Sequence, residues 1–257
     1  MMDWTQAIIL IFAGVLVGFI NTMAGGGSAI SLSVLMMMGL PATIANGTNR
    51  IAIILQNIAA VGSFKTQKVL DSRKSLLLSI PAVLGSILGA WLAVDIDKNI
   101  FEKVIGIILI IMLVFMFYKP KHWLQENSEL VNKGLSIKQY ILFFLIGIYG
   151  GFIQVGVGYF LLASLVYGAG YELVKANAAK VLIIGMYLIF SIAIYMYYDM
   201  IDYGKGFILA IGTVIGALIA SKMAVKKGAG FVRWIILVII VFTSLHLLGI
   251  LNLSIFH

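Results

Sequence analysis

The 257-residue chain contains no cysteine, which excludes disulfides, thiolate metal ligands and cysteine nucleophiles. It also carries little charge: only 11% of its residues are charged, against roughly 25% in soluble domains. A water-soluble fold is therefore excluded. Hydrophobic residues make up 62% of the chain, and several apolar stretches approach or exceed the ~20 residues that span a bilayer as a helix. The sequence predicts an all-α, polytopic integral membrane protein within the lipid bilayer.

Other residue types are missing where particular functions would need them. Residues 1–6 contain no lysine or arginine and no small-residue cleavage site follows, so the first apolar run is interpreted as a retained membrane helix rather than a signal peptide. The net charge is +8, but the positive residues lie mostly between apolar segments, which argues against nucleic-acid binding. The three histidines, His122, His246 and His257, are too scattered to predict a metal site, and no cofactor is expected.

The chain resembles itself with a period of about 130 residues, far longer than the roughly 20–50 residues of a solenoid repeat. Two pairs of stretches carry the similarity: Gly14 to Asn21 (GVLVGFIN) with Gly147 to Gln154 (GIYGGFIQ), and Gly39 to Asn49 with Gly170 to Lys180. A duplication of apolar halves that contain buried polar residues is typical of secondary transporters. We expect a first transmembrane repeat over 1–118, a cytoplasmic connector over 119–139 and a second transmembrane repeat over 140–257.

Each half contains five apolar segments, which gives eight to ten membrane helices according to whether the short segments cross. The segments lie at about 6–23, 28–40, 43–64, 74–94 and 99–118, and at about 140–155, 158–169, 173–198, 205–221 and 231–250. The second segment of each half is too short to cross as a regular helix, because 28–40 would extend only ~20 Å against a core of ~30 Å. Since each follows glycines, we expect a break inside the membrane and then a half-helix.

Loop charges predict the orientation of the chain. The loops at 65–74, 119–138 and 222–233 are basic, whereas those at 95–103 and 199–205 are net acidic. The positive-inside rule puts the basic loops in the cytoplasm. Because equivalent loops of the two halves then lie on opposite sides, the two repeats are predicted to be inverted, with both termini outside. The alternative is an even number of crossings with loosely biased loops.

Two cations, Arg50 and Lys180, lie within predicted membrane segments at nearly equivalent positions of the two halves. A charge in hydrocarbon costs at least ~2.5–3.5 kcal/mol, so by default it faces a cavity or a partner. All ten acidic residues lie at or near predicted loops and segment ends, which leaves the cations without an obvious counter-charge. The pair therefore favours a site for an anionic substrate. The alternatives are pairing with backbone carbonyls and snorkelling toward the membrane surface.

Polar residues at helical spacing share a face with each cation. The glycine-rich breaks add to the site, because a half-helix that starts near Ser28 offers unpaired N–H groups and a positive dipole end to an anion. The two breaks are expected to approach each other and face one substrate. Asn57 and Ser191 are interpreted instead as residues that hold helices together. The candidate substrate-binding residues are Asn21, Gly25, Gly26, Gly27, Ser28, Asn46, Asn49, Arg50, Gln56, Gln154, Gly158, Asn177 and Lys180.

The motifs of the first half resemble those of the TauE/SafE family of sulfite exporters and toluenesulfonate uptake permeases. The stretches concerned are GFINTMAGGGS (Gly18 to Ser28), GLPATIANGTNR (Gly39 to Arg50) and FKTQKVLD (Phe64 to Asp71). In the second half GGFIQVGVGY (Gly150 to Tyr159) keeps fewer glycines than the family pattern. The resemblance implies a permease of the bacterial or archaeal plasma membrane that moves sulfite, organosulfonates or sulfoacetate.

Taken together, these features predict a secondary transporter for small sulfur-containing anions that works by alternating access, and not an enzyme. No carboxylate within the membrane segments is available to bind a coupling ion, and an inside-negative potential favours export of an anion by about 2.3 kcal/mol per 100 mV. Export is therefore expected. The alternatives are an anion channel, a proton-coupled importer of organosulfonates or carboxylates, and an accessory membrane subunit. The sequence leaves open whether the chain forms a homodimer.

Overall fold

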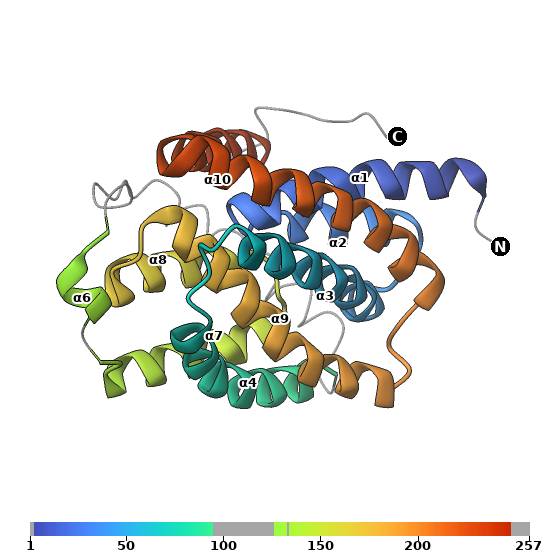
Figure 1. Ribbon diagram of the computed structural model, residues 1–257. Helices are drawn as coiled ribbons and strands as arrows, with labels where there is room; N and C mark the ends of the chain where they lie inside the picture. The colour runs from blue at the N-terminus through green and yellow to red at the C-terminus, as the bar shows by residue number, and fades with distance from the viewer. Residues whose placement is uncertain (1–2, 95–125, 133, 248–257) are drawn as a thin grey trace.

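The fold was obtained as a computed structural model, which describes residues 3–94, 126–132 and 134–247. All regular structure in this part of the chain is helical (Figure 1). The helices are α1 (Trp4–Met23), α2 (Ser28–Met37), α3 (Ala42–Thr66), α4 (Ser72–Val94), α6 (Ser128–Asn132), α7 (Ile137–Phe152), α8 (Val157–Ala169), α9 (Leu173–Tyr197) and α10 (Tyr203–Leu247). Helix α10 bends at Gly228, whose backbone is not helical (φ 74°, ψ −177°).

Four helices of the described chain are long and apolar enough to cross a membrane: α1, α4, α9 and the Tyr203–Ile236 part of α10. Helices α2, α7 and α8 are apolar but shorter. Helix α3 has 25 residues but is more polar, because it carries the amides and the arginine expected at the site. These helices confirm the predicted all-α, polytopic membrane protein.

The helix boundaries follow the predicted apolar segments closely. The clearest difference is α7, which begins at Ile137, inside the expected connector, because Ser136 and Gln139 form a capping box that starts the helix early. The short α2 and α8 occur where half-helices were expected. The predicted segment at 99–118 lies outside the described residues.

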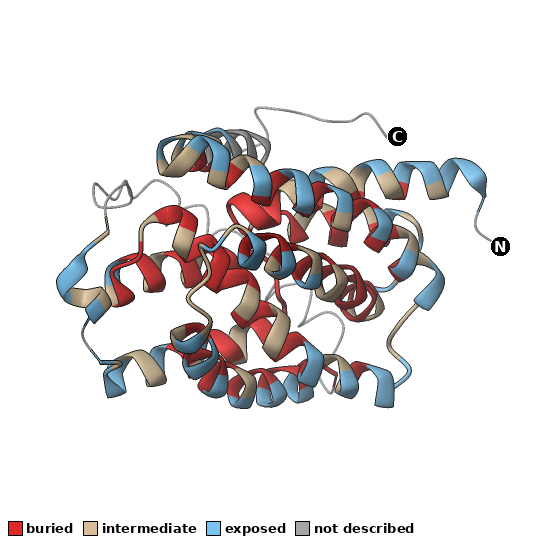
Figure 2. Cartoon of the chain, viewed as in Figure 1, coloured by how far each residue is buried: buried red, intermediate tan, exposed pale blue. Residues whose placement is uncertain are grey.

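The helices pack reciprocally between the two halves of the chain. Helix α1 runs along α10 and α7 runs along α4, so the first helix of each half packs against the other half (Figure 1). Helices α3 and α9 lie between these two pairs and contact each other. The buried residues concentrate in this central layer, whereas the outer faces of α1, α4 and α10 are exposed (Figure 2). Large apolar residues such as Phe12, Leu84 and Ile211 lie on these exposed faces, as expected for surfaces that contact lipid.

Glycines allow the two outer helix pairs to approach closely. A Cβ atom on Gly18 of α1 would lie 2.1 Å from the carbonyl oxygen of Thr213 on α10. In the other pair, a Cβ atom on Gly151 of α7 would lie 2.1 Å from the carbonyl oxygen of Ser86 on α4. Small residues at such crossings are a common way for membrane helices to gain van der Waals contact.

At one end of the bundle, polar side chains join the α8–α9 turn to the rest of the protein. The Tyr171 hydroxyl donates a hydrogen bond to Asp71 Oδ2 (2.7 Å), just before α4. Burial, together with this hydrogen bond, raises the pKa of Tyr171 above its usual range, so the hydroxyl keeps its proton and donates. Nearby, Lys175 at the start of α9 forms an ion pair with Glu126 (2.5 Å).

We expect Tyr171→Phe to lower the melting temperature of the purified protein. The substitution leaves Asp71 Oδ2 without its donor, and a hydrogen bond to a charged group contributes about 1.5–3 kcal/mol. Tyr197→Phe, on a side chain that is 82% exposed, is the matched control and should stay within about 0.5 kcal/mol of the native protein. Equal melting temperatures for the two variants would show that the Tyr171–Asp71 contact does not stabilise the fold.

Candidate functional site

Two helix breaks form the centre of the molecule. The first separates α1, which ends at Met23, from α2, which starts at Ser28, and its Gly25 has a φ of +99°. The second separates α7 from α8, and here Gln154 (φ 67°) and Gly156 (φ 70°) both adopt left-handed backbone conformations. A left-handed conformation at a glutamine is strained, and such strain is commonly found at functional sites.

The two breaks touch each other through glycines. A Cβ atom on Gly25 would lie 2.3 Å from Gly158 Cα, and one on Gly158 would lie 2.3 Å from Gly25 Cα. Such distances are far too short for a carbon–carbon contact, so neither position can carry a side chain unless the backbones separate. The structure thus brings the two breaks together, as the repeat pattern predicted.

A small cavity lies beside this contact. Its volume is about 10 Å³, which is about the space of one water molecule. The first residues of two helices line it, Ser28 of α2 and Val157 of α8, so the positive ends of both helix dipoles lie at the cavity. The complete lining is Asn21, Gly25, Ser28, Ile53, Gln56, Asn57, Gln154, Val157 and Ile184.

Hydrogen bonds fix the orientation of the amides in the first half of the site. The Ser28 N–H donates to Asn21 Oδ1 (3.1 Å), and Asn21 Nδ2 donates to Gln56 Oε1 (3.4 Å). Because a backbone N–H can only donate, this chain assigns the oxygen and nitrogen atoms of both amides. Gln56 Nε2 is then left as a donor without an acceptor in the described part of the chain.

The second half of the site has a related but different pair. Gln154 Oε1 accepts a hydrogen bond from the Tyr187 hydroxyl (2.8 Å), and Tyr187 occupies the position in α9 that Gln56 occupies in α3. In each half, the amide near the break is therefore hydrogen-bonded to a later helix of the same half: Asn21 to α3 and Gln154 to α9. The two pairs differ in chemistry, since an amide stands in one half where a phenol stands in the other.

Asn57 is the cavity residue whose importance the sequence did not reveal. Its side chain is 1% exposed, and neither Nδ2 nor Oδ1 has a hydrogen-bond partner among the described residues. A buried amide without partners is costly, so it points to a ligand or water that occupies the cavity. From the sequence alone, Asn57 is predicted to hold helices together. Two features of the sequence could have indicated its role in the site. Asn57 follows Gln56 directly, and the equivalent position of α9 holds the apolar Leu188, so the amide belongs to only one half of an asymmetric site.

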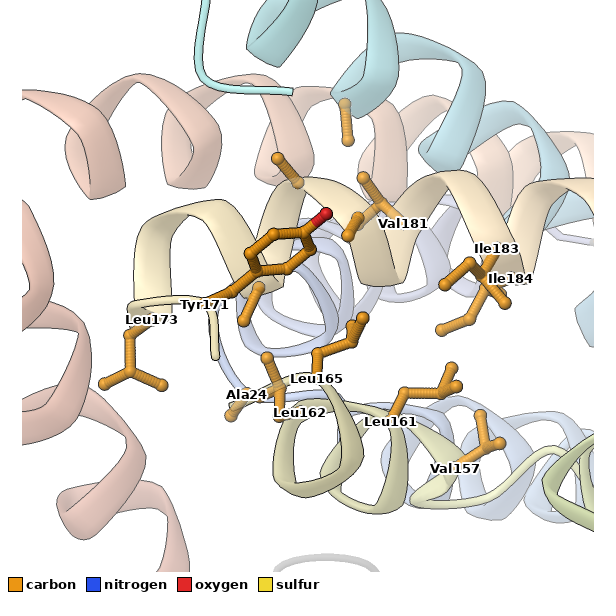
Figure 3. Close-up of a cluster of buried hydrophobic side chains, with 14 of the residues drawn as sticks. Ala24, Val157, Leu161, Leu162, Leu165, Tyr171, Leu173, Val181, Ile183 and Ile184 are labelled. Atoms are coloured by element: carbon orange, nitrogen blue, oxygen red, sulfur yellow. The ribbon is translucent and has the colours of Figure 1, made fainter. Parts of the chain in front are cut away.

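The remaining wall of the cavity is aliphatic. It consists of Ile53 from α3, Val157 from α8 and Ile184 from α9. Figure 3 shows Val157 and Ile184 on facing helices, at the edge of the large apolar cluster that fills the space between α8 and α9. This wall lowers the local dielectric constant and so strengthens the electrostatic interactions of the polar wall.

Arg50 belongs to α3, and its side chain reaches the C-terminal end of α7. Its Nη2 donates to the Gly151 carbonyl (2.5 Å) and the Tyr195 hydroxyl (3.1 Å), and its Nη1 donates to Ser191 Oγ (2.9 Å) and, at 3.5 Å, to the Gly150 carbonyl. The guanidinium also stacks on the Tyr195 ring, 4.2 Å from its centroid. Arg50 is completely buried, and its Nε has no partner among the described residues.

Lys180 belongs to α9, and its side chain reaches the C-terminal end of α1 in the corresponding way. Its Nζ donates to the carbonyl oxygens of Asn21 (2.9 Å) and Thr22 (3.0 Å) and to Asn177 Oδ1 (2.6 Å). Neither Lys180 nor Arg50 lines the cavity, and neither has an acidic partner in the described part of the chain. Both therefore show the pairing with backbone carbonyls that the sequence had left open as an alternative.

The structure thus divides the thirteen candidate residues into two groups. Asn21, Gly25, Ser28, Gln56 and Gln154 line the cavity, and Gly158 contacts Gly25. The other seven do not line the cavity. Asn46 Nδ2 donates to the Phe152 carbonyl (2.9 Å), Asn177 accepts from Lys180, and Asn49 is buried with an Oδ1 that has no partner among the described residues. Gly26 and Gly27 pack against Tyr159 and Val17, and Arg50 and Lys180 bind carbonyls at the ends of α7 and α1.

Comparison with known families decides the class of the protein. Residues 10–247 match the sulfite exporter TauE/SafE family. The chain belongs to this family. The match covers both halves and all of the site, and it confirms the resemblance that the motifs of the first half carried.

Two relatives of this TauE/SafE protein are similar to it along most of their length. A protein of Haemophilus influenzae called "Probable membrane transporter protein" is 29% identical over 231 residues, which cover 88% of each chain. YfcA of Escherichia coli K12, with the same description, is 26% identical over 240 residues, covering 93% of this chain and 88% of YfcA. No solved structure matches the chain. The chain is thus a multi-pass membrane protein of a transporter family and not an enzyme.

Proposed function

We propose that this TauE/SafE protein is a secondary transporter for small sulfur-containing anions such as sulfite, organosulfonates or sulfoacetate. The observation that carries the proposal is the buried Asn57 amide without partners, in a cavity at the positive ends of two half-helices. In a transporter family, such a cavity is the natural place for the substrate.

The chemistry of the cavity favours an anion over a cation. Its lining contains no acidic side chain, and it has amide donors and two helix N-termini whose positive dipole ends favour an anion. Arg50 and Lys180 add positive charge behind this wall, since no acid neutralises them among the described residues. Substrate oxygens would accept hydrogen bonds from the side-chain amides of Gln56, Asn57 and Gln154, while Asn21 and Ser28, bonded to each other, hold Gln56 in place. The aliphatic wall would contact the apolar part of a sulfonate.

The closed cavity supports alternating access rather than a channel. The lining residues are almost completely buried and the space holds about one water, which is less than an oxyanion needs. The two repeats, inverted in the membrane, would then move relative to each other around the Gly25–Gly158 contact. We place the protein in a bacterial or archaeal plasma membrane, with the basic loops in the cytoplasm, both termini outside, and export as its direction.

Asn57→Leu tests this site, because leucine has the same branched arrangement of side-chain heavy atoms and is the residue at the equivalent position of α9. We expect about 10- to 100-fold weaker apparent affinity for sulfite or methanesulfonate in proteoliposomes, since a hydrogen bond to a charged group contributes about 1.5–3 kcal/mol. Asn57→Asp should weaken binding further, because it puts a negative charge beside the anion.

Asn132→Leu, on the exposed face of the short helix α6, serves as the matched control and should transport normally. Sulfate and acetate, offered in the same assay, define the substrate class. If Asn57→Leu binds and transports the sulfur anions with native affinity, the substrate does not occupy this cavity.

A further inference from the structure

The ends of the two broken helices are occupied by cations from the opposite half of the chain. The last turn of α1 leaves the Asn21 and Thr22 carbonyls without backbone donors, and the Lys180 ammonium binds both. The last turn of α7 leaves the Gly150 and Gly151 carbonyls, and the Arg50 guanidinium binds both.

The oxygen set around Lys180 has the composition of a binding site for a monovalent cation. Two backbone carbonyls and the Asn177 amide oxygen lie 2.6–3.0 Å from Nζ. Three acceptors satisfy the three N–H groups of an ammonium, so the charged form is fully bonded here. No carboxylate contributes to the set, as no salt bridge involves Lys180 among the described residues.

In transporters with discontinuous helices, the two sides of a helix break commonly bind different ions. Half-helix N-termini face the anionic group of the substrate, whereas carbonyls at the C-terminal ends bind a coupling cation such as Na⁺. In this protein the N-termini of α2 and α8 lie at the cavity, but the C-terminal ends of α1 and α7 already hold Lys180 and Arg50. The side-chain cations of Lys180 and Arg50 thus occupy the positions at which a mobile coupling ion would bind.

We infer that Lys180 and Arg50 are built-in counter-ions of the two helix breaks, so that transport requires no bound Na⁺ or proton and moves only the charge of the anion. The two residues act as positioning residues: they hold the ends of α1 and α7, and with them the cavity residues Asn21 and Gln154. The inference rests on the proposed transport of anions and adds how that transport is driven.

The wild-type protein tests the energetic part in proteoliposomes. Sulfite flux, driven by a valinomycin potential at equal pH on both sides, should be unchanged when Na⁺ outside and inside is replaced by N-methylglucamine. The charge that moves per sulfite should equal the charge of the ion. Dependence of the flux on Na⁺ would overturn the inference, as would uphill transport of methanesulfonate, an anion with no protonated form near neutral pH, driven by a pH gradient at zero potential. The second result would instead make Lys180 a proton carrier.

Chemical rescue tests the structural part without relying on transport. Lys180→Ala should lower the melting temperature and reduce flux by at least about tenfold, because three oxygen acceptors lose their cation. Propylammonium replaces the atoms that the substitution removes and should raise the melting temperature of this variant by mass action. Lys180→Arg, which keeps the charge, should retain more flux than Lys180→Ala.

Lys175→Ala, which removes the ion pair with Glu126 at the end of the bundle, is the control and should show no response to propylammonium. If Lys180→Ala is as stable as the native protein, or propylammonium has no effect on its melting temperature, Lys180 is not a counter-ion of the break. Because this measurement needs no substrate, it separates a failure of the inference from a failure of the proposed function.

Discussion

Replacing Gly158 by alanine is expected to abolish transport. The new Cβ atom would lie 2.3 Å from Gly25 Cα and 3.1 Å from the Gly25 carbonyl oxygen. Backbone atoms cannot turn away as a flexible side chain can, so the two helix breaks must separate. Overpacking of this kind costs about 1–3 kcal/mol or more, and it falls on the contact around which the cavity is built. We expect at least about a 100-fold loss of flux in proteoliposomes, equivalent to ~2.7 kcal/mol.

The same change at Gly62 is the control for this prediction. Gly62 lies in α3, and a Cβ atom there would meet nothing within 4 Å. Since alanine is a better helix former than glycine by about 1 kcal/mol, Gly62→Ala should transport normally and melt at the same or a higher temperature. Native flux in Gly158→Ala would mean that the close contact of the breaks is not needed in the transport cycle.

Loss of Arg50 should cause the largest fall in stability among substitutions of single charged residues. Arg50→Met keeps much of the side-chain volume but leaves the Gly150 carbonyl without a donor. It also removes the charged donor from the Gly151 carbonyl and the Tyr195 hydroxyl, which keep only Tyr195 and Asn46 as donors. Removing one partner from a buried charged network costs about 3–5 kcal/mol. We expect a strong drop in melting temperature and little or no transport, measured on purified and reconstituted protein.

Arg50→Lys separates the charge from the geometry. Lysine supplies the charge as a compact ammonium but cannot form the planar fork that reaches both carbonyls and stacks on Tyr195, so only partial recovery is expected. Arg73→Met, on an exposed residue at the start of α4, is the matched control and should change stability by less than about 0.5 kcal/mol. Comparable effects at the two positions would contradict the role assigned to Arg50.

Most helices of this fold could be predicted from the sequence, because the bilayer imposes a length and an apolar composition on each span. The short α2 and α8 were predictable for the same reason, since a segment like Ser28–Met37 is too short for the core and follows three glycines. The start of α7 was missed because a local side-chain cap at Ser136, rather than hydrophobicity, determines it.

The site was only partly predictable. Repeated motifs placed Asn21, Gln154 and the glycines correctly at two breaks, and the structure brings them together. What the sequence could not supply is the direction in which the long side chains of Arg50 and Lys180 reach. Each could extend to the cavity or to a neighbouring helix end, and the choice depends on carbonyls that lie over 100 residues away in the chain.

The exchange of caps between the two halves also bears on how such a protein could have originated. Each half carries the cation that completes its neighbour's first helix and lacks the one that would complete its own. A single half would therefore have been complete only when paired with a second copy in the reciprocal arrangement.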